Sequence, residues 1–376
     1  MRTSTEPRGW YPNDLSRDSS WIHRLSAEEI GGLESALACA KARGKLMLDM
    51  TREDFPLNGA ALGAVRKAFR ATQERWGLCL IKGLPIDRWS VDETRMVFWG
   101  LALHVGIARP QNRASQIMTD VLDEGGTYKT KNGRGYNTNA ELDFHMDSCD
   151  VVCLLCLNPA KSGGESKIFS SMAMCDEIAR IRPDLLAVLR QPVFHSYQGS
   201  QDASQPPYFS CPVLGSESEQ FAFRTNRRNI NSAQTDFDDV PRMSPAQLEA
   251  LNLMDKLMPD PGLCYSMWLE RGDLQLLNNY VIGHSRTGYE DFDEPEKKRH
   301  LLRLWLAVPD SQRLPVEWTQ FCGDPRAGAV RGGVRGSAIT SGFLAYQSRQ
   351  AGILGMPLAK QVQEVTHPVT EPSSRS

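Results

Sequence analysis

The sequence predicts a mainly β fold with helical flanks, built as an antiparallel sandwich or barrel. Short apolar or alternating runs between turn residues begin after about residue 127, and this spacing is typical of all-β folds. Helical signals dominate before that point. With 41% apolar residues, the chain has enough apolar material for a large core. The predicted strands are Phe144–Leu157, Ser166–Phe169, Val193–Tyr197, Phe221–Thr225, Asp273–Ile282 and Arg299–Val308.

The N-terminal third is predicted to be mostly helical, because two capping boxes open periodic apolar stretches. Ser26–Glu29 begins a helix that ends at Gly44, and Ser90–Glu93 begins a helix that runs to about residue 105. Between them we expect a helix over residues 60–75, with one buried face, and a short strand over Gly77–Gly83.

The rest of the chain is predicted to form one catalytic domain. Two helices, Ala173–Leu189 and Ser244–Met258, interrupt its strands, and Pro245 favours the first turn of the second helix. The Gly- and Arg-rich segment Gly323–Gly336 is expected to be a loop or lid. The expected division is a helical N-terminal extension packed on the core (1–76), a β catalytic domain (77–310), a C-terminal lid or extension (311–366) and a disordered tail (367–376).

Charge, hydropathy and cysteine content exclude several classes of protein. The chain has 43 Lys and Arg against 45 Asp and Glu, which argues against nucleic acid as the main partner. The longest apolar run, Val151–Leu157, is far shorter than the roughly 18 residues of a membrane-spanning helix. No apolar signal segment opens the sequence and the nine cysteines are scattered, so a reduced, cytoplasmic protein is expected. Cys149, Cys153 and Cys156 are interpreted as buried free thiols.

The main chemical signal is a pair of metal-ligand residues, His145 and Asp147, in a predicted strand. Side chains two residues apart on a strand point to the same face, so the pair can bind one metal ion. His-x-Asp alone is unspecific, but a second apolar stretch, Gly272–His284, ends in another histidine. Two histidines and one carboxylate leave coordination positions open, as in non-haem Fe(II) oxygenases, although zinc accepts the same ligands.

A nearby arginine indicates an anionic cosubstrate. Arg303 lies inside the apolar strand Arg299–Val308, where an unpaired cation would be costly to bury. Its planar guanidinium suits a carboxylate held by two parallel hydrogen bonds. A carboxylate beside a metal with three protein ligands points to a keto acid.

In these features the chain resembles the taurine/2,4-D dioxygenase (TauD/TfdA-like) superfamily of Fe(II)- and 2-oxoglutarate-dependent oxygenases. The matching features follow one another in order over residues 127–308, about half of the chain. The resemblance implies a double-stranded β-helix (a jelly roll, similar to cupins) with iron at its mouth. The matching residues are His145-x-Asp147, Gly163-Gly-Glu-Ser166, Gly272-Asp273, Asn278-Asn279, His284-x-Arg-Thr287 and Arg299-x3-Arg303.

The resemblance also implies a role for each matching residue. His145, Asp147 and His284 would bind Fe(II), and Arg303 would hold the distal carboxylate of 2-oxoglutarate. The residue after the Gly-Gly-acid turn, Ser166, would contact the same carboxylate through its hydroxyl. Arg299 matches a second family arginine near the cosubstrate, or is a solvated residue at a strand start. An insertion before these arginines leaves both open as the main 2-oxoglutarate ligand, and the apolar strand favours Arg303.

The family reaction couples the conversion of 2-oxoglutarate to succinate and CO2 to the oxidation of an unactivated C–H bond by O2. Hydroxylation is the expected outcome, and desaturation and cyclisation stay open. Related halogenases replace the carboxylate ligand by a small residue, so Asp147 argues against halogenation. Two other functions remain as alternatives: a non-catalytic metal-binding β-barrel that senses a ligand, and a zinc hydrolase on the same barrel.

The substrate is expected to be a small molecule, such as a carboxylate or an amino-acid derivative, because several arginines flank the motifs. The family often forms homo-oligomers, so this chain is a candidate for one. Each candidate substrate-binding residue also has an ordinary structural explanation as a turn, strand end or core residue. Arg286 is expected to point away from the metal. The candidates are Tyr136, Asn137, Asn139, Tyr208, Phe209, Arg224, Phe343 and Tyr346.

Overall fold

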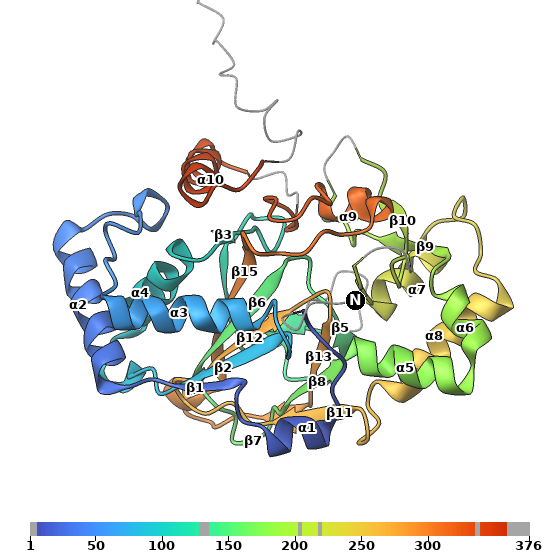
Figure 1. The fold of residues 1–376 in the computed structure, drawn as a ribbon, viewed down its shortest axis with the longest axis horizontal. Coiled ribbons are helices and arrows are strands. Elements are labelled where there is room, and N and C mark those ends of the chain that lie inside the picture. Colours follow the sequence, from blue (N-terminus) through green and yellow to red (C-terminus); the bar gives the residue numbers. More distant parts are fainter. Residues whose placement is uncertain (1–5, 128–134, 202–204, 217–219, 335–338, 359–376) are drawn as a thin grey trace, which may run out of the picture.

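The computed structural model contains two main β-sheets that enclose a cavity, with helices around them (Figure 1). Leu154 of the larger sheet and His284 of the smaller sheet both line this cavity. The arrangement is the predicted double-stranded β-helix with helical flanks. The structure describes residues 6–127, 135–201, 205–216, 220–334 and 339–358.

The larger sheet has seven strands, in the order β1-β2-β12-β6-β15-β3, and β4 pairs with β15 beside β3. Pairing in this sheet is antiparallel except between β1 and β2. Because strand side chains alternate between faces, β6 and β15 present one set to the cavity and the other to an outer core. The strands are β1 (Ile22–Arg24), β2 (Leu78–Lys82), β3 (Ile107–Ala108), β4 (Met118–Val121), β6 (Val151–Asn158), β12 (Leu274–Asn278) and β15 (His300–Ala307).

The smaller sheet has four antiparallel strands in the order β11-β8-β13-β5. Two short antiparallel pairs, β9 with β10 and β7 with β14, stand beside the main sheets. The strands of the smaller sheet are β5 (Leu142–His145), β8 (Ser166–Ser170), β11 (Cys264–Met267) and β13 (Ile282–Arg286); the paired strands are β7 (Ser162–Gly163), β9 (Pro192–Ser196), β10 (Tyr208–Pro212) and β14 (Tyr289–Glu290).

Two groups of helices flank the sheets on opposite sides, α2 to α4 on one and α5 to α8 on the other (Figure 1). None of the helices in the described part of the chain has the length and apolar character needed to cross a membrane. The helices are α1 (Pro12–Arg17), α2 (Ala27–Arg43), α3 (Gly59–Ala71), α4 (Val91–Leu103), α5 (Ser171–Ile181), α6 (Pro183–Val188), α7 (Arg227–Asp236), α8 (Pro245–Leu257), α9 (Thr319–Cys322) and α10 (Ser341–Leu354).

The largest apolar core joins segments from the whole chain. Leu37 of α2 and Phe98 of α4 belong to the same buried cluster as Leu276 and Leu304 on the outer face of the larger sheet. Phe343 of α10 belongs to this cluster as well. The N-terminal extension, the β region and the C-terminal region therefore share one core.

The two helix starts that were predicted from capping residues are confirmed. The Ser26 and Ser90 side chains accept hydrogen bonds from the backbone N–H groups of Glu29 and Glu93 and form capping boxes with them. Gly44 ends α2 with φ of +60°, a left-handed conformation that a residue with a Cβ rarely adopts. Local hydrogen-bonding residues thus define these helix ends, which is why the sequence alone could predict them.

Two predicted strands are wrong in one respect, because each is divided between the two sheets. The run over residues 144–157 becomes β5 and β6, and the stretch Gly272–His284, which contains the predicted strand Asp273–Ile282, becomes β12 and β13. Both halves of each run are largely buried, so an apolar run does not reveal where the chain crosses from one sheet to the other. As a consequence, Asp147 lies two residues beyond the end of β5 and not inside a strand.

Other elements also differ from the prediction. Phe221–Thr225 forms only an isolated bridge, between Phe223 and Leu214. The helix expected over residues 173–189 is two helices, because Pro183 begins a new one. Residues of the expected helical extension form β1, which pairs with β2. The sequence signals did not predict α1, α7, α10 or β10, and the expected tail 367–376 lies outside the described residues.

Candidate metal centre

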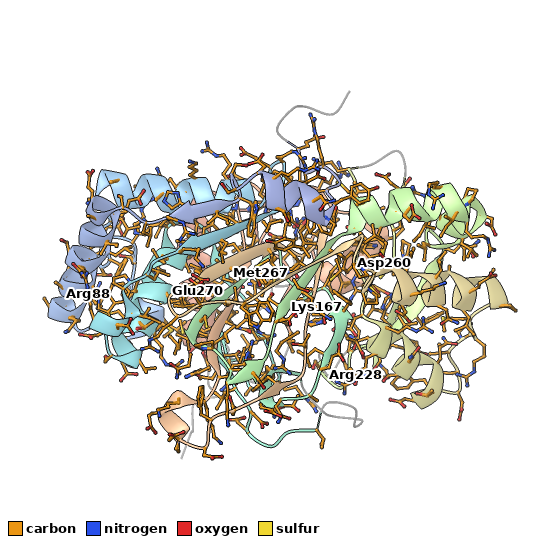
Figure 2. All side chains as sticks on the ribbon, turned by 90° about the horizontal axis from the view of Figure 1, so that it is seen from below. Arg88, Lys167, Arg228, Asp260, Met267 and Glu270 are labelled. Atoms are coloured by element: carbon orange, nitrogen blue, oxygen red, sulfur yellow. The ribbon has the colours of Figure 1, made fainter. Side chains whose placement is uncertain are left out.

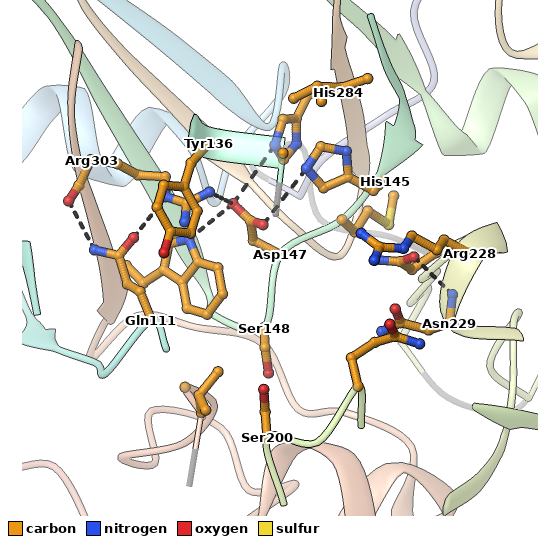
Figure 3. Close-up of a pocket in the computed structure, with 18 of the residues that line it drawn as sticks. Gln111, Tyr136, His145, Asp147, Ser148, Ser200, Arg228, Asn229, His284 and Arg303 are labelled. Atoms are coloured by element: carbon orange, nitrogen blue, oxygen red, sulfur yellow. Dashed lines mark hydrogen bonds and ion pairs between the residues drawn. The ribbon is translucent and has the colours of Figure 1, made fainter. Parts of the chain in front are cut away.

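Three predicted metal ligands meet on the wall of the cavity. His145 is the last residue of β5, and His284 lies directly opposite it on β13 in the antiparallel register. Asp147 follows two residues after His145, and its side chain points back to both imidazole rings (Figure 3). Two segments far apart in sequence are therefore brought together by sheet pairing.

The distances within this group fit a single cation. The Nε2 atoms of His145 and His284 lie 3.8 Å and 3.7 Å from the two carboxylate oxygens of Asp147. One ligand atom from each residue lies within 4.8 Å of the others. Ligand atoms this close can share an ion at bond lengths of about 2 Å. Elsewhere in the described residues, no other group of three such side chains has this geometry.

Both histidines present Nε2 to the centre in the form that binds metals. The Nδ1 of His145 is 2.9 Å from the carbonyl oxygen of Asp143, to which it donates, so the Nε2 lone pair is available. His284 is buried, and its burial, together with nearby positive charge, lowers its pKa to about 3. It is neutral at ordinary pH, as a metal ligand must be.

Asp147 is held in place by neighbours from two other segments, β15 and the residues after β12. Its Oδ2 accepts a hydrogen bond of 2.9 Å from the Trp305 indole, and its backbone N–H donates to the Asn279 side chain at 3.0 Å. Burial alone would raise the pKa of Asp147, but its neighbours, foremost the positive charge of Arg303, outweigh the burial and lower the pKa. The carboxylate is therefore charged and oriented.

The two candidate arginines on the β15 side have different surroundings. Arg303 lies beside the centre, with Nη1 3.8 Å from Asp147 Oδ2, and its Nε donates to the Gln111 side chain at 2.7 Å. Arg299 is 6% exposed, lies against the Tyr289 ring and lines the same cavity. Its Nη1 has no hydrogen-bond partner among the described residues. Arg303 is thus already engaged at the metal ligands, whereas Arg299 is a buried cation with an unused donor.

The Gly-Gly-acid turn makes room for Arg299. Gly164 has φ of +73°, and a Cβ on it would come within 3.1 Å of the Arg299 Nε. Two residues later, Ser166 begins β8, lines the cavity and donates to the Gln275 side chain at 3.1 Å. The glycine, the serine and the arginine of the sequence pattern therefore belong to one corner of the cavity wall.

The substrate candidates divide into residues that reach the cavity and residues that do not. Tyr136, Phe209 and Arg224 line the cavity, which has a volume of about 250 Å³. Tyr208 points elsewhere and donates to Asp239 at 2.5 Å, as expected for the strand neighbour of Phe209. The other candidates are not among the residues lining the cavity: Asn137, Asn139, Phe343 and Tyr346.

Phe343 and Tyr346 serve the core and not the site. Tyr346 packs on Trp99 of α4 with ring centroids 5.1 Å apart, and Phe343 packs on Tyr346. Both are almost completely buried on α10. Their aromatic side chains are explained by the docking of α10 onto the N-terminal helices.

Two further site features were missed or misjudged. Trp305 lies two residues after Arg303 on β15, so the two-residue strand period was the available signal for its position. Arg286 was expected to point away, but it lies two residues after His284 on β13 and lines the cavity. Its Nε donates to the carbonyl oxygen of Thr287 at 3.3 Å.

The cysteines behave as predicted. Cys149, Cys153 and Cys156 are buried free thiols, and burial raises the pKa of each. None of them belongs to a metal-binding group among the described residues. Cys149 instead accepts a hydrogen bond from Asn279 at 3.1 Å, which helps to fix the residue that holds Asp147.

A jelly roll with two histidines and one aspartate at its cavity belongs to the class of non-haem iron oxygenases. The family model of the taurine catabolism dioxygenase TauD, TfdA family matches residues 43–305, well over half of the chain. The chain belongs to this family, and it is an Fe(II)- and 2-oxoglutarate-dependent dioxygenase.

Curated relatives share sequence over most of their length. The FR-33289 synthase of Streptomyces rubellomurinus is 29% identical over 310 residues, which cover 82% of this chain and 91% of that protein. The taurine hydroxylase-like protein SAT17 of Stachybotrys chartarum is 26% identical, over 78% of this chain and 77% of that protein. A uridine-5'-phosphate dioxygenase of Amycolatopsis sp. is 24% identical over 51% of this chain and 68% of that protein.

Solved structures confirm the fold. The non-heme iron oxygenase OrfP, in a complex with Fe and alpha-ketoglutaric acid, aligns with a TM-score of 0.56 and 16% identity over 76% of this chain and 93% of that chain. An asparagine oxygenase in complex with Fe(II), hydroxyasparagine and succinate aligns with a TM-score of 0.55 and the same identity and coverage. These similarities concern the arrangement of strands and helices.

Proposed function

We propose that this protein hydroxylates a C–H bond of a small molecule at Fe(II) bound by His145, Asp147 and His284, with 2-oxoglutarate and O2 as cosubstrates. The observation that carries the proposal is the convergence of three ligand atoms within 4.8 Å on the wall of a cavity that also contains buried arginines. Membership of a dioxygenase family supports the same chemistry.

The donor set fits the proposed metal. Two imidazoles from the paired strands β5 and β13 and the carboxylate that follows β5 form a facial triad, which leaves positions for other ligands. When bound there, Fe(II) would supply open positions for the keto acid and O2 and the redox chemistry that oxidises them and the substrate. The chain's own part is to hold the donor atoms still. Trp305 and Asn279 do so for Asp147, and the Asp143 carbonyl does so for His145.

We assign the distal carboxylate of 2-oxoglutarate to Arg299, which revises the preference for Arg303 drawn from the apolar strand. Arg299 is buried, has an unused Nη1 donor and faces the cavity from the corner that contains Gly164 and Ser166. A carboxylate there would satisfy the donor and neutralise a charge that is costly to bury. The Ser166 hydroxyl lies in the same corner and is a second candidate contact.

Arg303 has a different role in this proposal. Its guanidinium lies 3.8 Å from Asp147 and is fixed by Gln111, which both accepts from its Nε and donates to its backbone carbonyl at 2.8 Å. Arg303 therefore keeps Asp147 ionised and oriented for the metal. Arg303 would act on the metal through Asp147, so its loss is expected to affect metal binding more than 2-oxoglutarate binding.

Hydroxylation is the outcome that the ligand set favours. Asp147 occupies the position that would have to be a small residue to admit a halide, so halogenation is disfavoured. Desaturation and cyclisation begin from the same hydrogen abstraction, and the shape of the bound substrate decides between them. Two relatives carry the names of small molecules with an acidic group, the sulfonate of taurine and the phosphate of uridine 5'-phosphate, which supports a small-molecule substrate here as well.

Succinate formation tests the proposal directly. Purified protein is incubated with Fe(II), 2-oxoglutarate and a library of small molecules, and succinate is measured with and without O2. The proposal expects succinate only when Fe(II), 2-oxoglutarate and O2 are all present, with stimulation by the true substrate. Product formation from a substrate under argon would instead support the zinc hydrolase. Binding of a library compound without any 2-oxoglutarate consumption would support the ligand sensor.

A further inference from the structure

The cavity has an unusual balance of charge. Among the described residues that line it, the only carboxylate is Asp147, whereas five arginines reach it. Fe(II) would add positive charge, and the two carboxylates of 2-oxoglutarate would only offset that addition. The remaining positive charge is therefore expected to attract an anionic substrate. The five arginines are Arg224, Arg228, Arg286, Arg299 and Arg303.

Arg224 is the member of this set whose surroundings most clearly lack a negative charge. It is only 4% exposed, and its guanidinium stacks on the Phe321 ring at 3.7 Å and lies 5.3 Å from the Phe209 ring. Its Nη1 is 3.2 Å from the Nδ1 of His195 and 3.6 Å from the Cys211 sulfur. Its Nε is buried without a hydrogen-bond partner among the described residues.

The neighbouring His195 does not neutralise the positive charge of Arg224. It is completely buried and stacks on Phe209, with ring centroids 5.1 Å apart and nearly parallel planes. Its burial, and secondly the positive charge of Arg224, lowers its pKa well below the ordinary value, so His195 is neutral and accepts a hydrogen bond from the guanidinium. No carboxylate pairs with Arg224 among the described residues, and an unpaired buried cation is costly.

The segment that carries Arg224 runs beside the metal ligands. The Met146 N–H donates to the carbonyl oxygen of Thr225 at 3.0 Å, and Asn226 forms a β-bridge with His145. Polar side chains that follow, on and near α7, line the same wall. Figure 3 shows Arg228 and Asn229 across the cavity from Arg303 and Gln111, with Asp147 between them.

We propose that Arg224 is a substrate-binding residue that pairs with an anionic oxygen group of the substrate, either a carboxylate or a phosphoryl or phosphonyl group. The rings of Phe209 and Phe321 fix the plane of the Arg224 guanidinium. Its Nε donor, which has no partner among the described residues, is therefore pre-organised for such a group. This inference rests on the proposed function, because it names the substrate class of the same cavity. Arg299 binds the cosubstrate, and Arg224 binds the molecule that is oxidised.

Anaerobic calorimetry tests the inference without turnover. The probes are methylphosphonate and acetate, titrated into the protein loaded with Fe(II) and saturating 2-oxoglutarate. We expect Arg224→Met to weaken binding of the preferred probe at least tenfold, because charge-assisted hydrogen bonds are lost. Arg180→Met, which removes an exposed charge whose ion pair among the described residues is with Glu177 on its own helix, is the matched control and is expected to bind like the wild type.

The probes also distinguish the two sources of the anion. Tighter binding of methylphosphonate indicates a phosphoryl or phosphonyl substrate, and tighter binding of acetate indicates a carboxylate. If Arg224→Met does not fold by circular dichroism, Arg224→Lys keeps the charge but loses the planar fork, and we expect severalfold weaker binding. Equal binding by wild type and folded Arg224 variants, or no binding of either probe to the wild type, would overturn the inference.

A failure of the proposed function would look different. In that case the wild-type protein would not convert 2-oxoglutarate to succinate with any library compound, whatever its affinity for the probes. If succinate forms but the best substrates are neutral and the Arg224 variants use them normally, the oxygenase stands and only the anion assignment is wrong.

Discussion

The cavity has two sides that are built differently. On the metal side, the functional groups come from paired strands and the residues next to them, and hydrogen bonds orient two of the three: Trp305 holds Asp147, and the Asp143 carbonyl holds His145. On the opposite side, the lining comes from connecting segments and short elements, such as the stretch from Arg224 to Asn229. The first side carries the residues proposed to bind the metal, and the second, called the recognition side below, carries residues proposed to bind the substrate.

This difference explains how one scaffold can keep a reaction and change a substrate. Strand register fixes His145 opposite His284, and moving either strand by one residue would turn a ligand away from the cavity. Connecting segments such as residues 197–201 can change in length and side chains without disturbing that register. The following predictions test whether the two sides are as separate as this account holds.

The largest effect is expected at the metal side. Asp147→Ala removes the only ligand that carries a negative charge, and we expect succinate formation to fall below detection while the fold is retained. Asp143→Ala is the control, because that side chain is exposed and only its backbone carbonyl contacts His145. Near-normal succinate formation in Asp147→Ala would contradict the metal assignment.

The buried pair of Arg331 and Asp150 is expected to give the largest effect on stability. Arg331 Nε donates to Asp150 at 2.7 Å, both side chains are fully buried, and the pair joins the C-terminal segment to the start of β6. Arg331→Met is expected to lower the free energy of unfolding by about 3–5 kcal/mol, because it leaves a buried charge unpaired. Urea unfolding followed by fluorescence measures the change.

The neighbouring pair of Arg326 and Asp324 provides a comparison for that measurement. Arg326 pairs with Asp324 in the same segment, but its side chain is 58% exposed. Solvent reaches the Arg326 guanidinium although Asp324 is buried, so Arg326→Met is expected to lower the free energy of unfolding by less than Arg331→Met does. Equal effects of the two substitutions would show that burial does not separate them.

The two β15-side arginines are expected to differ in kind. Arg299→Met is expected to raise the KM for 2-oxoglutarate at least about tenfold, because it removes charged hydrogen bonds to the distal carboxylate. Arg303→Met is expected to lower Fe(II) affinity instead, with a smaller change in that KM. Steady-state succinate assays at saturating Fe(II) measure the KM for 2-oxoglutarate, and titrations with Fe(II) measure the affinity for the metal. The reverse pattern would restore Arg303 as the 2-oxoglutarate ligand.

The smallest effect is expected from a candidate that the fold turns away from the cavity. Tyr208→Phe removes a hydroxyl that donates to Asp239 near the surface. We expect less than about a twofold change in the kcat and KM for substrate, because the lost hydrogen bond is far from the reacting groups. A large loss of activity would mean that the recognition side includes β10 residues on both faces.

The sequence predicted the metal side better than the recognition side, for a physical reason. His145, Asp147 and His284 were found because metal chemistry restricts the residue types, and the capping boxes were found because helix ends depend on local hydrogen bonds. The points where the chain passes from one sheet to the other were missed, because a buried strand of either sheet has the same apolar sequence pattern.

The recognition side gives weaker signals. Arg224 was predicted as a candidate for binding a substrate anion, with a solvated strand end as the alternative, but its stacking on Phe321 depends on a contact between segments far apart in the chain. Phe343 was misjudged because an aromatic residue near a C-terminus is equally suited to a lid and to a core. Tertiary packing, which leaves no short-range pattern, decides these positions.

The most direct test of the account is Fe(II) binding measured by anaerobic calorimetry on the wild type, His284→Ala and His23→Ala. The account predicts one Fe(II) per wild-type chain, the same in His23→Ala, whose imidazole contacts Glu29 away from the cavity, and a loss of that binding in His284→Ala. Binding of Fe(II) to His284→Ala with wild-type affinity would contradict the convergence of β5 and β13 on a single iron.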